Sequence, residues 1–137
     1  MIASLTGRLA SKHPGGVVID VQGVGYDVLI PLSTYYRLPD PEQPVALTIH
    51  THVREDAIQL FGFSTSREKD AFLMLLGVSG IGPKLALSVI SSLSVDVLAA
   101  AIRTDDQKTL ASVPGIGKKS AARLVLELTD KVEKLGA

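Results

Sequence analysis

The first half of the chain alternates between short apolar runs and clusters of turn-forming residues. Glycine, proline and aspartate gather at residues 13–16, 23–25 and 39–44, and clusters of this kind bound β-strands. The runs between them predict five strands, at residues 2–9, 16–21, 26–30, 45–54 and 57–63. Five short strands in so short a segment favour a closed Greek-key barrel of the OB type over an open sheet, because closure removes exposed strand edges.

After residue 64 the apolar positions recur at helical spacing instead. A Thr-Ser-Arg-Glu capping box at residues 65–68 opens a helix that reaches residue 76, and Pro83 suits the first position of a helix ending near residue 93. Ser94 can cap a helix over residues 95–103, and a Thr-Asp-Asp-Gln capping box at 104–107 starts another. The last helix covers residues 118–135, with one apolar stripe along it. The pattern therefore predicts an α+β chain, with a five-stranded barrel domain at residues 1–64 and an all-α domain at residues 65–137.

The helical half contains an internal repeat with an offset of 35 residues. Residues 78–86 read Val-Ser-Gly-Ile-Gly-Pro-Lys-Leu-Ala, and residues 113–121 read Val-Pro-Gly-Ile-Gly-Lys-Lys-Ser-Ala. Extended to residues 93 and 128, the two segments are identical at seven of 16 positions. Such a repeat indicates one supersecondary unit used twice, and here the unit is a helix, a short Gly-Ile-Gly hairpin and a second helix.

Each hairpin is a predicted phosphate-binding site. The glycines leave the backbone bare for close approach, and the N–H groups that begin the second helix lie unpaired at the positive end of its dipole. A cation follows each hairpin: Lys84 in the first copy, and Lys118, Lys119 and Arg123 in the second. One such hairpin could merely turn the chain, but two copies with cations favour binding of a phosphate backbone. Neither copy fits a Walker A loop or a dinucleotide fingerprint, because neither follows a strand.

Composition is compatible with this interpretation once the charge is followed along the chain. The 14 Lys and Arg residues balance the 14 Asp and Glu residues, and a zero balance alone is unusual for a nucleic-acid-binding domain. Residues 1–64 carry four basic and six acidic residues, whereas residues 65–137 carry ten and eight. The two halves therefore have net charges of −2 and +2, and the basic half is the helical one.

The composition also excludes several classes of protein. The chain has no cysteine, which excludes disulfide scaffolds, thiolate zinc sites and cysteine nucleophiles. It shows neither a secretory signal nor an apolar stretch that could span a membrane, so we expect a folded cytoplasmic protein. Each half is near the size at which one core is barely sufficient, so self-association is expected to stabilise it.

Two other activities are weaker interpretations of the same sequence. His50 and His52 share a face of one predicted strand, as ligands of a nuclease metal would, but no third ligand is well placed. Single-strand binding needs aromatic platforms. Only six aromatic residues are present, and we expect two of them, Phe61 and Phe63, in the barrel core. The sequence therefore predicts no metal, no cofactor and no catalytic residue.

The two Gly-Ile-Gly hairpins resemble tandem helix–hairpin–helix motifs, which hold duplex DNA by its backbone without reading sequence. Four further segments resemble the RuvA family: Gly-Val-Gly-Tyr at 23–26, Val-Arg-Glu-Asp-Ala at 53–57, Leu-Phe-Gly-Phe at 60–63 and Gly-Pro-Lys-Leu-Ala-Leu at 82–87. The resemblance covers essentially the whole chain. It implies binding of four-way (Holliday) DNA junctions during branch migration, in bacterial recombination and repair.

The resemblance also implies roles for individual residues. A homotetramer, or two tetramers on one junction, would grip the DNA arms with its hairpins. One backbone site would comprise Ser79, Gly80, Gly82 and Lys84, and the other Gly115, Gly117, Lys118, Lys119 and Arg123. Glu55 and Asp56, which read from the residues alone as a solvated turn, match the family's acidic pin, and Arg54 beside them would contact the DNA backbone or the pin.

Two partner proteins follow from the same resemblance. The family scaffolds the RuvB motor, which hydrolyses ATP, while the RuvC resolvase cuts the junction. A linker and a third, RuvB-binding domain normally follow, and this sequence ends at residues 135–137, where that linker would begin. Whether this chain engages RuvB is therefore left open. A duplex-binding adaptor without junction preference and a metal nuclease are the competing interpretations.

Overall fold

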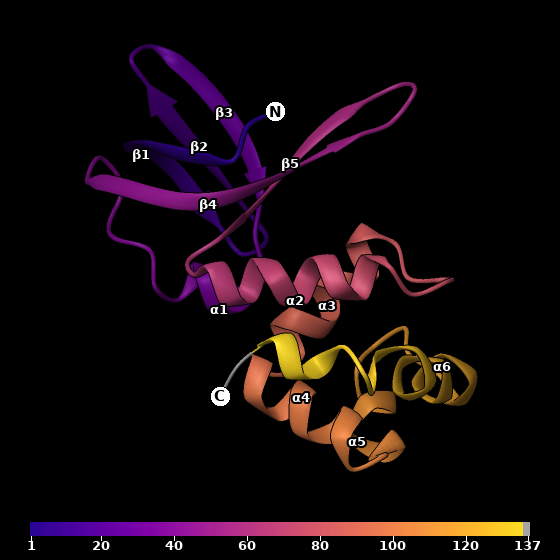
Figure 1. Cartoon of the computed structure of the whole chain (residues 1–137). Coiled ribbons are helices and arrows are strands. Elements are labelled where there is room, and N and C mark those ends of the chain that lie inside the picture. The colour runs from indigo at the N-terminus through magenta and orange to yellow at the C-terminus, as the bar shows by residue number, and fades with distance from the viewer. Residues whose placement is uncertain (136–137) are drawn as a thin grey trace. The chain divides into compact units, whose positions relative to one another are not determined.

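The computed structural model describes residues 1–135 (Figure 1). Residues 136 and 137, where the linker is expected to begin, lie outside the described part. The chain divides into two compact units, one of residues Met1–Lys69 and one that starts at Asp70. Helix α2 (Ser66–Leu76) begins in the first unit and ends in the second.

The first unit is a closed barrel of five strands. Its strands are β1 (Ser4–His13), β2 (Gly16–Val21), β3 (Val24–Leu29), β4 (Pro44–Val53) and β5 (Ile58–Phe63). They follow the order β1-β2-β3-β5-β4 around the barrel, with β3 and β5 parallel and the other pairs antiparallel. The predicted five-stranded barrel is thus confirmed. The first strand is longer than expected and contains an irregularity between Leu9 and Ser11, where a bulge bends the strand around the barrel.

Aliphatic side chains fill the barrel, and the two phenylalanines of β5 do not. The interior is formed by Leu5, Leu9, Val17, Ile19, Val28, Ile30, Val45, Leu47, Ile49 and Leu60. A Cβ on Gly62 would lie 2.7 Å from Val28 Cγ1 and 3.1 Å from Leu47 Cδ1, so Gly62 faces the interior. Successive residues of a strand alternate between faces. Phe61 and Phe63, both fully buried, therefore lie on the outer face of β5, and their expected place in the barrel core was wrong.

A buried carboxylate holds the first turn of α2 within the barrel unit. Glu68 is only 8% exposed, and it accepts hydrogen bonds from the hydroxyl groups of Ser33 and Ser64, the latter at 2.8 Å. Ser33 belongs to α1 (Leu32–Tyr35), a short helix that the sequence did not predict. The Thr65 hydroxyl accepts from the Glu68 N–H at 3.2 Å, as a capping box requires. The Glu68 carboxylate meanwhile links α1, the end of β5 and α2.

The second unit is all-α. It contains the remainder of α2 and then α3 (Pro83–Ser92), α4 (Val95–Arg103), α5 (Gln107–Ala111), α6 (Lys118–Leu128) and a 3₁₀ turn, η1 (Val132–Leu135). Its fully buried side chains include Phe72, Leu75, Leu98, Ile102, Leu110 and Leu124. Pro83 occupies the first turn of α3, and the Ser94 hydroxyl caps α4 by accepting from the Val97 N–H at 3.1 Å. Both predicted starts are confirmed.

Two predicted helix boundaries in this unit were wrong. Thr104 ends α4 instead of capping the next helix, and its hydroxyl donates to the Ala100 carbonyl at 2.8 Å. Asp105 follows with a φ of 54°, which breaks the helical path, so that Asp106 is the N-cap of α5. The expected long last helix ends at Leu128, and the apolar stripe is completed by η1 after a turn.

Neither a membrane span nor a metal cluster is found in the described part of the chain. No single helix among these residues has both the length and the apolarity to cross a bilayer; the pair α3–α4, bent by 99°, meets that test by length and composition only. Within residues 1–135, no three His, Asp or Glu side chains gather as metal ligands. The rings of His50 and His52 lie 5.9 Å apart, and His50 stacks on Phe61. Burial, aided by the positive charges of His52 and Lys69, lowers the pKa of His50 below its ordinary value.

Candidate nucleic-acid interface

The two hairpins of the second unit have the same backbone conformation. Gly80 has a φ of 88° and Gly115 a φ of 93°, values that residues with a side chain rarely adopt. The isoleucine after each of these glycines is buried, Ile81 at 6% and Ile116 at 5% exposed. Each isoleucine therefore anchors its hairpin in the core. The anchored isoleucine leaves the flanking glycine backbone at the surface.

The hydrogen bonds of the two copies match position by position. The Ile81 N–H donates to the Val78 carbonyl at 3.1 Å, and its counterpart, Ile116, donates to Val113 at 3.0 Å. The second helix of each copy closes its first turn through a bond of 2.9 Å, from Ala86 to Gly82 and from Ala121 to Gly117. The 35-residue repeat of the sequence is therefore a structural repeat of the whole helix–hairpin–helix unit.

The start of each second helix is open to solvent. Gly82 and Gly117 are the N-caps of α3 and α6, and a Cβ built on either would meet nothing within 4 Å. The N–H groups that precede the first intrahelical bond point out of the helix end, where the dipole is positive. Lys118 supplies one more of these N–H groups than its counterpart Pro83, because proline has none.

The predicted cations lie in the first two turns of α3 and α6 and are all exposed. Lys84 follows the first hairpin, and Lys118 and Lys119 follow the second. Lys119 and Arg123 line one surface hollow of about 370 Å³ with Ser120, Ala122 and Leu126. Lys119 and Arg123 thus lie on one face of α6, since residues four apart on a helix are neighbours.

A pair of reciprocal hydrogen bonds connects the two copies. The Ser88 hydroxyl of α3 donates to the Pro114 carbonyl of the second hairpin at 3.3 Å. The Arg123 guanidinium of α6 donates to the Ser79 carbonyl of the first hairpin at 3.4 Å. Residues 88 and 123 are equivalent in the repeat, and so are 79 and 114, so the bonds are related by the repeat's own symmetry. Sequence reasoning missed this link, although the equivalent positions were visible in the alignment of the two copies.

Arg123 therefore has contacts within the protein as well as an exposed surface. Its Nε lies 3.6 Å from a Glu127 carboxylate oxygen, one turn further along α6. With its Nη1 directed to the first hairpin, Arg123 can hold the two copies together and still present charge to a phosphate. Ser79 contributes its backbone carbonyl to this link.

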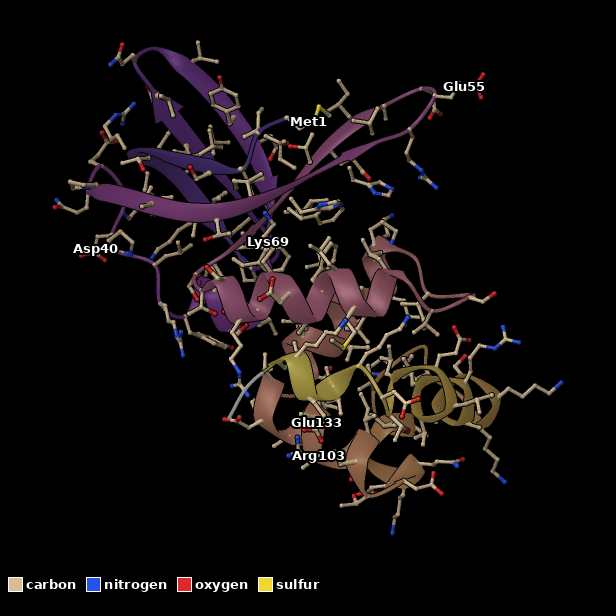
Figure 2. All side chains as sticks on the ribbon, viewed as in Figure 1. Met1, Asp40, Glu55, Lys69, Arg103 and Glu133 are labelled. Atoms are coloured by element: carbon tan, nitrogen blue, oxygen red, sulfur yellow. The ribbon has the colours of Figure 1, made fainter. Side chains whose placement is uncertain are left out.

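The acidic pair lies in the barrel unit, at the turn between β4 and β5. The Arg54 N–H donates to the Ala57 carbonyl at 2.8 Å, which closes a four-residue turn with Glu55 and Asp56 at its centre. All four residues are exposed. Figure 2 shows Glu55 at the far end of the arm formed by the two strands. Two carboxylates at such a tip create a local negative field within a unit that is otherwise a packed barrel.

These features define a class of protein: an OB-type barrel with an acidic tip, followed by two helix–hairpin–helix units with a cationic surface for a nucleic-acid backbone. Family models agree with both parts, since the RuvA N terminal domain matches residues 1–62 and the SAM-like helix-hairpin-helix tandem matches residues 72–130. The chain belongs to the RuvA family.

Its relatives are bacterial proteins named Holliday junction branch migration complex subunit RuvA. The one from Geobacter sulfurreducens is 58% identical over 135 residues, which cover 98% of this chain and 68% of the relative. Those from Geotalea daltonii and Syntrophotalea carbinolica are 55% and 59% identical, over 99% and 96% of this chain and 68% and 66% of theirs. The chain thus spans about two thirds of the length of these relatives.

Proposed function

We propose that this chain is the junction-binding part of a branch-migration complex. It binds four-way DNA junctions by their structure, without reading sequence, and serves as a non-catalytic scaffold for an ATP-driven motor. The observation that carries this proposal is the repeated hairpin, with matched glycine conformations and hydrogen bonds beside exposed lysines. The names of the relatives, which specify the Holliday junction and branch migration, support the choice of substrate.

The hairpins hold the DNA arms by their phosphates. In the first site the backbone at Ser79, Gly80 and Gly82 approaches the phosphate and Lys84 neutralises it. The second site uses Gly115, Gly117, Lys118, Lys119 and Arg123 in the same way. Contacts of this kind position the protein on any duplex, since phosphates carry no sequence information. Each neutralised phosphate releases counterions, so affinity falls steeply as salt rises.

The acidic tip acts at the centre of the junction. Glu55 and Asp56 form the pin, and in a homotetramer four such tips would present eight carboxylates to the crossing strands. Their charge repels phosphates and so keeps the strands apart while the junction migrates. Arg54 contacts the backbone of the nearest strand or steadies the pin.

The assembly comprises a homotetramer, with a second tetramer able to close over the other face of the junction. RuvB supplies the ATPase and RuvC the resolvase, on the chromosome in the bacterial cytoplasm. We place the boundary between the barrel domain and the helical domain between residues 64 and 65, after the last strand and before α2, although the first turn of α2 packs with the barrel unit.

One competition experiment tests the proposal. A labelled four-way junction is challenged with unlabelled linear duplex in a gel-shift assay containing Mg²⁺, and the products are then run on a denaturing gel. We expect retention of the junction against a large excess of duplex, with every strand intact. Equal competition by duplex would instead make the chain a general duplex adaptor, and strand scission would support the metal nuclease.

The pin is tested by neutralising its two carboxylates. Glu55→Gln with Asp56→Asn keeps the size of both side chains, so we expect junction affinity to be preserved while strand separation at the crossover changes. Light scattering of both proteins checks that they assemble alike. Loss of all junction binding in this variant would contradict a guiding role and make the tip part of the binding surface.

A further inference from the structure

Beyond the barrel, β4 and β5 form a two-stranded arm. The pairing of β4 with β1 reaches Thr48, and the pairing of β5 with β3 begins at Leu60. Between these points and the tip, the strands pair with each other. The last link to the barrel is the Thr51 hydroxyl, which donates to the Ile2 carbonyl at 2.7 Å. The arm from residue 52 to residue 59 therefore carries the acidic tip away from the barrel (Figure 2).

The two faces of this arm differ in chemistry. His52 lies opposite Gln59 on one face, and Val53 lies opposite Ile58 on the other. Side chains opposite each other on antiparallel strands contact directly, so Val53 and Ile58 form one apolar pair. They are 53% and 68% exposed. Together with Met1, which is 87% exposed and precedes the Ile2 link, they give this side of the arm an apolar surface.

An exposed apolar pair on a projecting hairpin indicates a binding surface, since water is a poor partner for it. The charges at the tip limit what that partner can be. Arg54 offsets only one of the two carboxylates of Glu55 and Asp56, so the tip keeps a net negative charge that repels a phosphate backbone from the pair. A second arm packed directly against the pair would hold four carboxylates closer together than tips that face the crossing strands of a junction, and this costs electrostatic energy. A nucleobase has an uncharged apolar face and donor groups at its edge, and it fits both the pair and the tip.

We propose that Val53 and Ile58 form an apolar wedge that contacts nucleobases unstacked at the centre of the junction. The inference rests on the proposed junction binding and adds a second function to the pin: the carboxylates turn the phosphates away, and the apolar pair holds the freed bases. Aliphatic side chains do wedge between base steps in proteins that kink DNA. The acidic tip alone offers the bases no apolar contact, whereas the arm places the apolar pair of Val53 and Ile58 directly behind the tip.

The test uses a four-way junction with 2-aminopurine at the crossover, whose fluorescence rises when the base unstacks. The full chain is compared with Val53→Thr/Ile58→Thr, which keeps β-branched residues in both strands. We expect the fluorescence increase to fall by about half or more in the double variant, while its junction affinity stays within about twofold of the wild type. Val24→Thr, a similarly exposed valine of β3 (54%), is the matched control and keeps the full signal.

A swap that preserves apolarity, Val53→Ile/Ile58→Val, is expected to retain the signal. A wild-type fluorescence change in the threonine variant would overturn the wedge. So would a fall in the assembly's mass by light scattering, which would assign this face to contacts between copies of the chain. If the wild-type chain showed no preference for the junction over duplex, the proposed function itself would fail. The gel-shift competition measures that preference, so its failure is distinguished from a failure of the wedge, which the fluorescence measures.

Discussion

The first and second helix–hairpin–helix copies have the same backbone conformation but present different side chains to solvent. Their glycines share a φ near 90°, and their internal hydrogen bonds agree within about 0.3 Å. The buried positions agree as well, with Val, Ile and Ala in both copies. The surface positions differ, because the second copy has Lys118 for Pro83 and Arg123 for Ser88.

The first helices of the two copies differ even more. In the first copy this helix is α2, with 11 residues, whereas in the second it is α5, with five. Both nevertheless deliver a buried leucine, Leu75 or Leu110, to the same place before the hairpin. The hairpin is therefore set by its glycines and by a few buried apolar residues, and the charges around it vary without altering its shape. The second copy concentrates the cations and is expected to dominate binding.

The largest effect is expected from removing these cations copy by copy. Lys118→Gln/Lys119→Gln should lower duplex affinity about 100-fold and Lys84→Gln about tenfold, since a hydrogen bond to a charged group contributes about 1.5–3 kcal/mol. The slope of log K against log salt should become shallower by about 1.8 and about 0.9, respectively. Fluorescence anisotropy across a salt series measures both quantities.

The control for this comparison is Lys134→Gln, which removes a charge of the same unit from η1, outside both hairpins. Its salt slope should equal that of the wild type. Equal losses from the two copies would contradict the asymmetry, and unchanged slopes would show that the lysines do not neutralise phosphates.

How far could the sequence alone lead to this arrangement? The hairpins were predictable because glycine, isoleucine and lysine recur at one offset, and repetition separates a functional pattern from a common turn. The strands were predictable because Gly, Pro and Asp mark their ends. Helix α1 was not, because four residues are too few to show a helical period.

The other features that the sequence did not predict depend on contacts between residues far apart in the chain. The Glu68 carboxylate bonds to Ser33, 35 residues earlier, and Arg123 bonds to Ser79, 44 residues earlier. No local pattern in the sequence specifies either partner. The side on which Phe61 and Phe63 lie was mistaken for the same reason, because the alternation with Gly62 was visible but its orientation toward the barrel depended on packing.

The next effect concerns the glycines with positive φ. Gly80→Ala and Gly115→Ala should each lose about 1–2 kcal/mol of folding stability, because a Cβ disfavours left-handed backbone conformations. Gly115→Ala should be the more costly, since its Cβ would lie 2.8 Å from Leu85 Cδ1, whereas the space at Gly80 is open. Urea denaturation of the helical unit's signal measures the difference. Equal losses would mean that Leu85 moves aside freely.

A smaller effect is expected from substitutions that test how closely the DNA backbone approaches the start of α3 and of α6. Gly82→Ala and Gly117→Ala introduce a Cβ at extended φ, −93° and −96°, where no strain arises and no protein atom lies within 4 Å. Alanine is a poorer N-cap than glycine but reduces the entropy of the unfolded chain, so stability should stay near that of the wild type. The new methyl group should keep the DNA backbone further away and lower DNA affinity about fivefold, which corresponds to roughly 1 kcal/mol of binding free energy.

Anisotropy and urea denaturation of the same samples separate binding from folding in these two variants. A larger affinity loss for Gly117→Ala would extend the asymmetry from side chains to the backbone. Wild-type affinity in both variants would contradict close approach of DNA to the N-caps.

The smallest expected effect is a pH dependence confined to the second copy. Hydrogen bonds from the Thr109 hydroxyl and N–H lower the pKa of Asp106, the N-cap of α5, below its ordinary 3.8. The ionised carboxylate is thus favoured in the folded state, so its stabilising contribution is complete above pH 3.8 and is lost as the pH falls through the lower folded value. Asp106→Ala should therefore destabilise α5 at pH 7, and the difference from the wild type should shrink below pH 4.

The first copy provides the control for that titration, because its first helix is capped by the Thr65 hydroxyl, which accepts from the Glu68 N–H and does not titrate in this range. Thr65→Ala should cost the same at pH 7 and at pH 3. Asp106→Asn, an equally good cap without a titrating group, should remove the pH dependence while retaining α5. Amide exchange at Leu110 follows the stability of this short helix directly. An Asp106→Ala difference that persisted at pH 3 would show that the neutral acid caps α5 as well as the carboxylate does, and the two copies would then be alike in their response to acid.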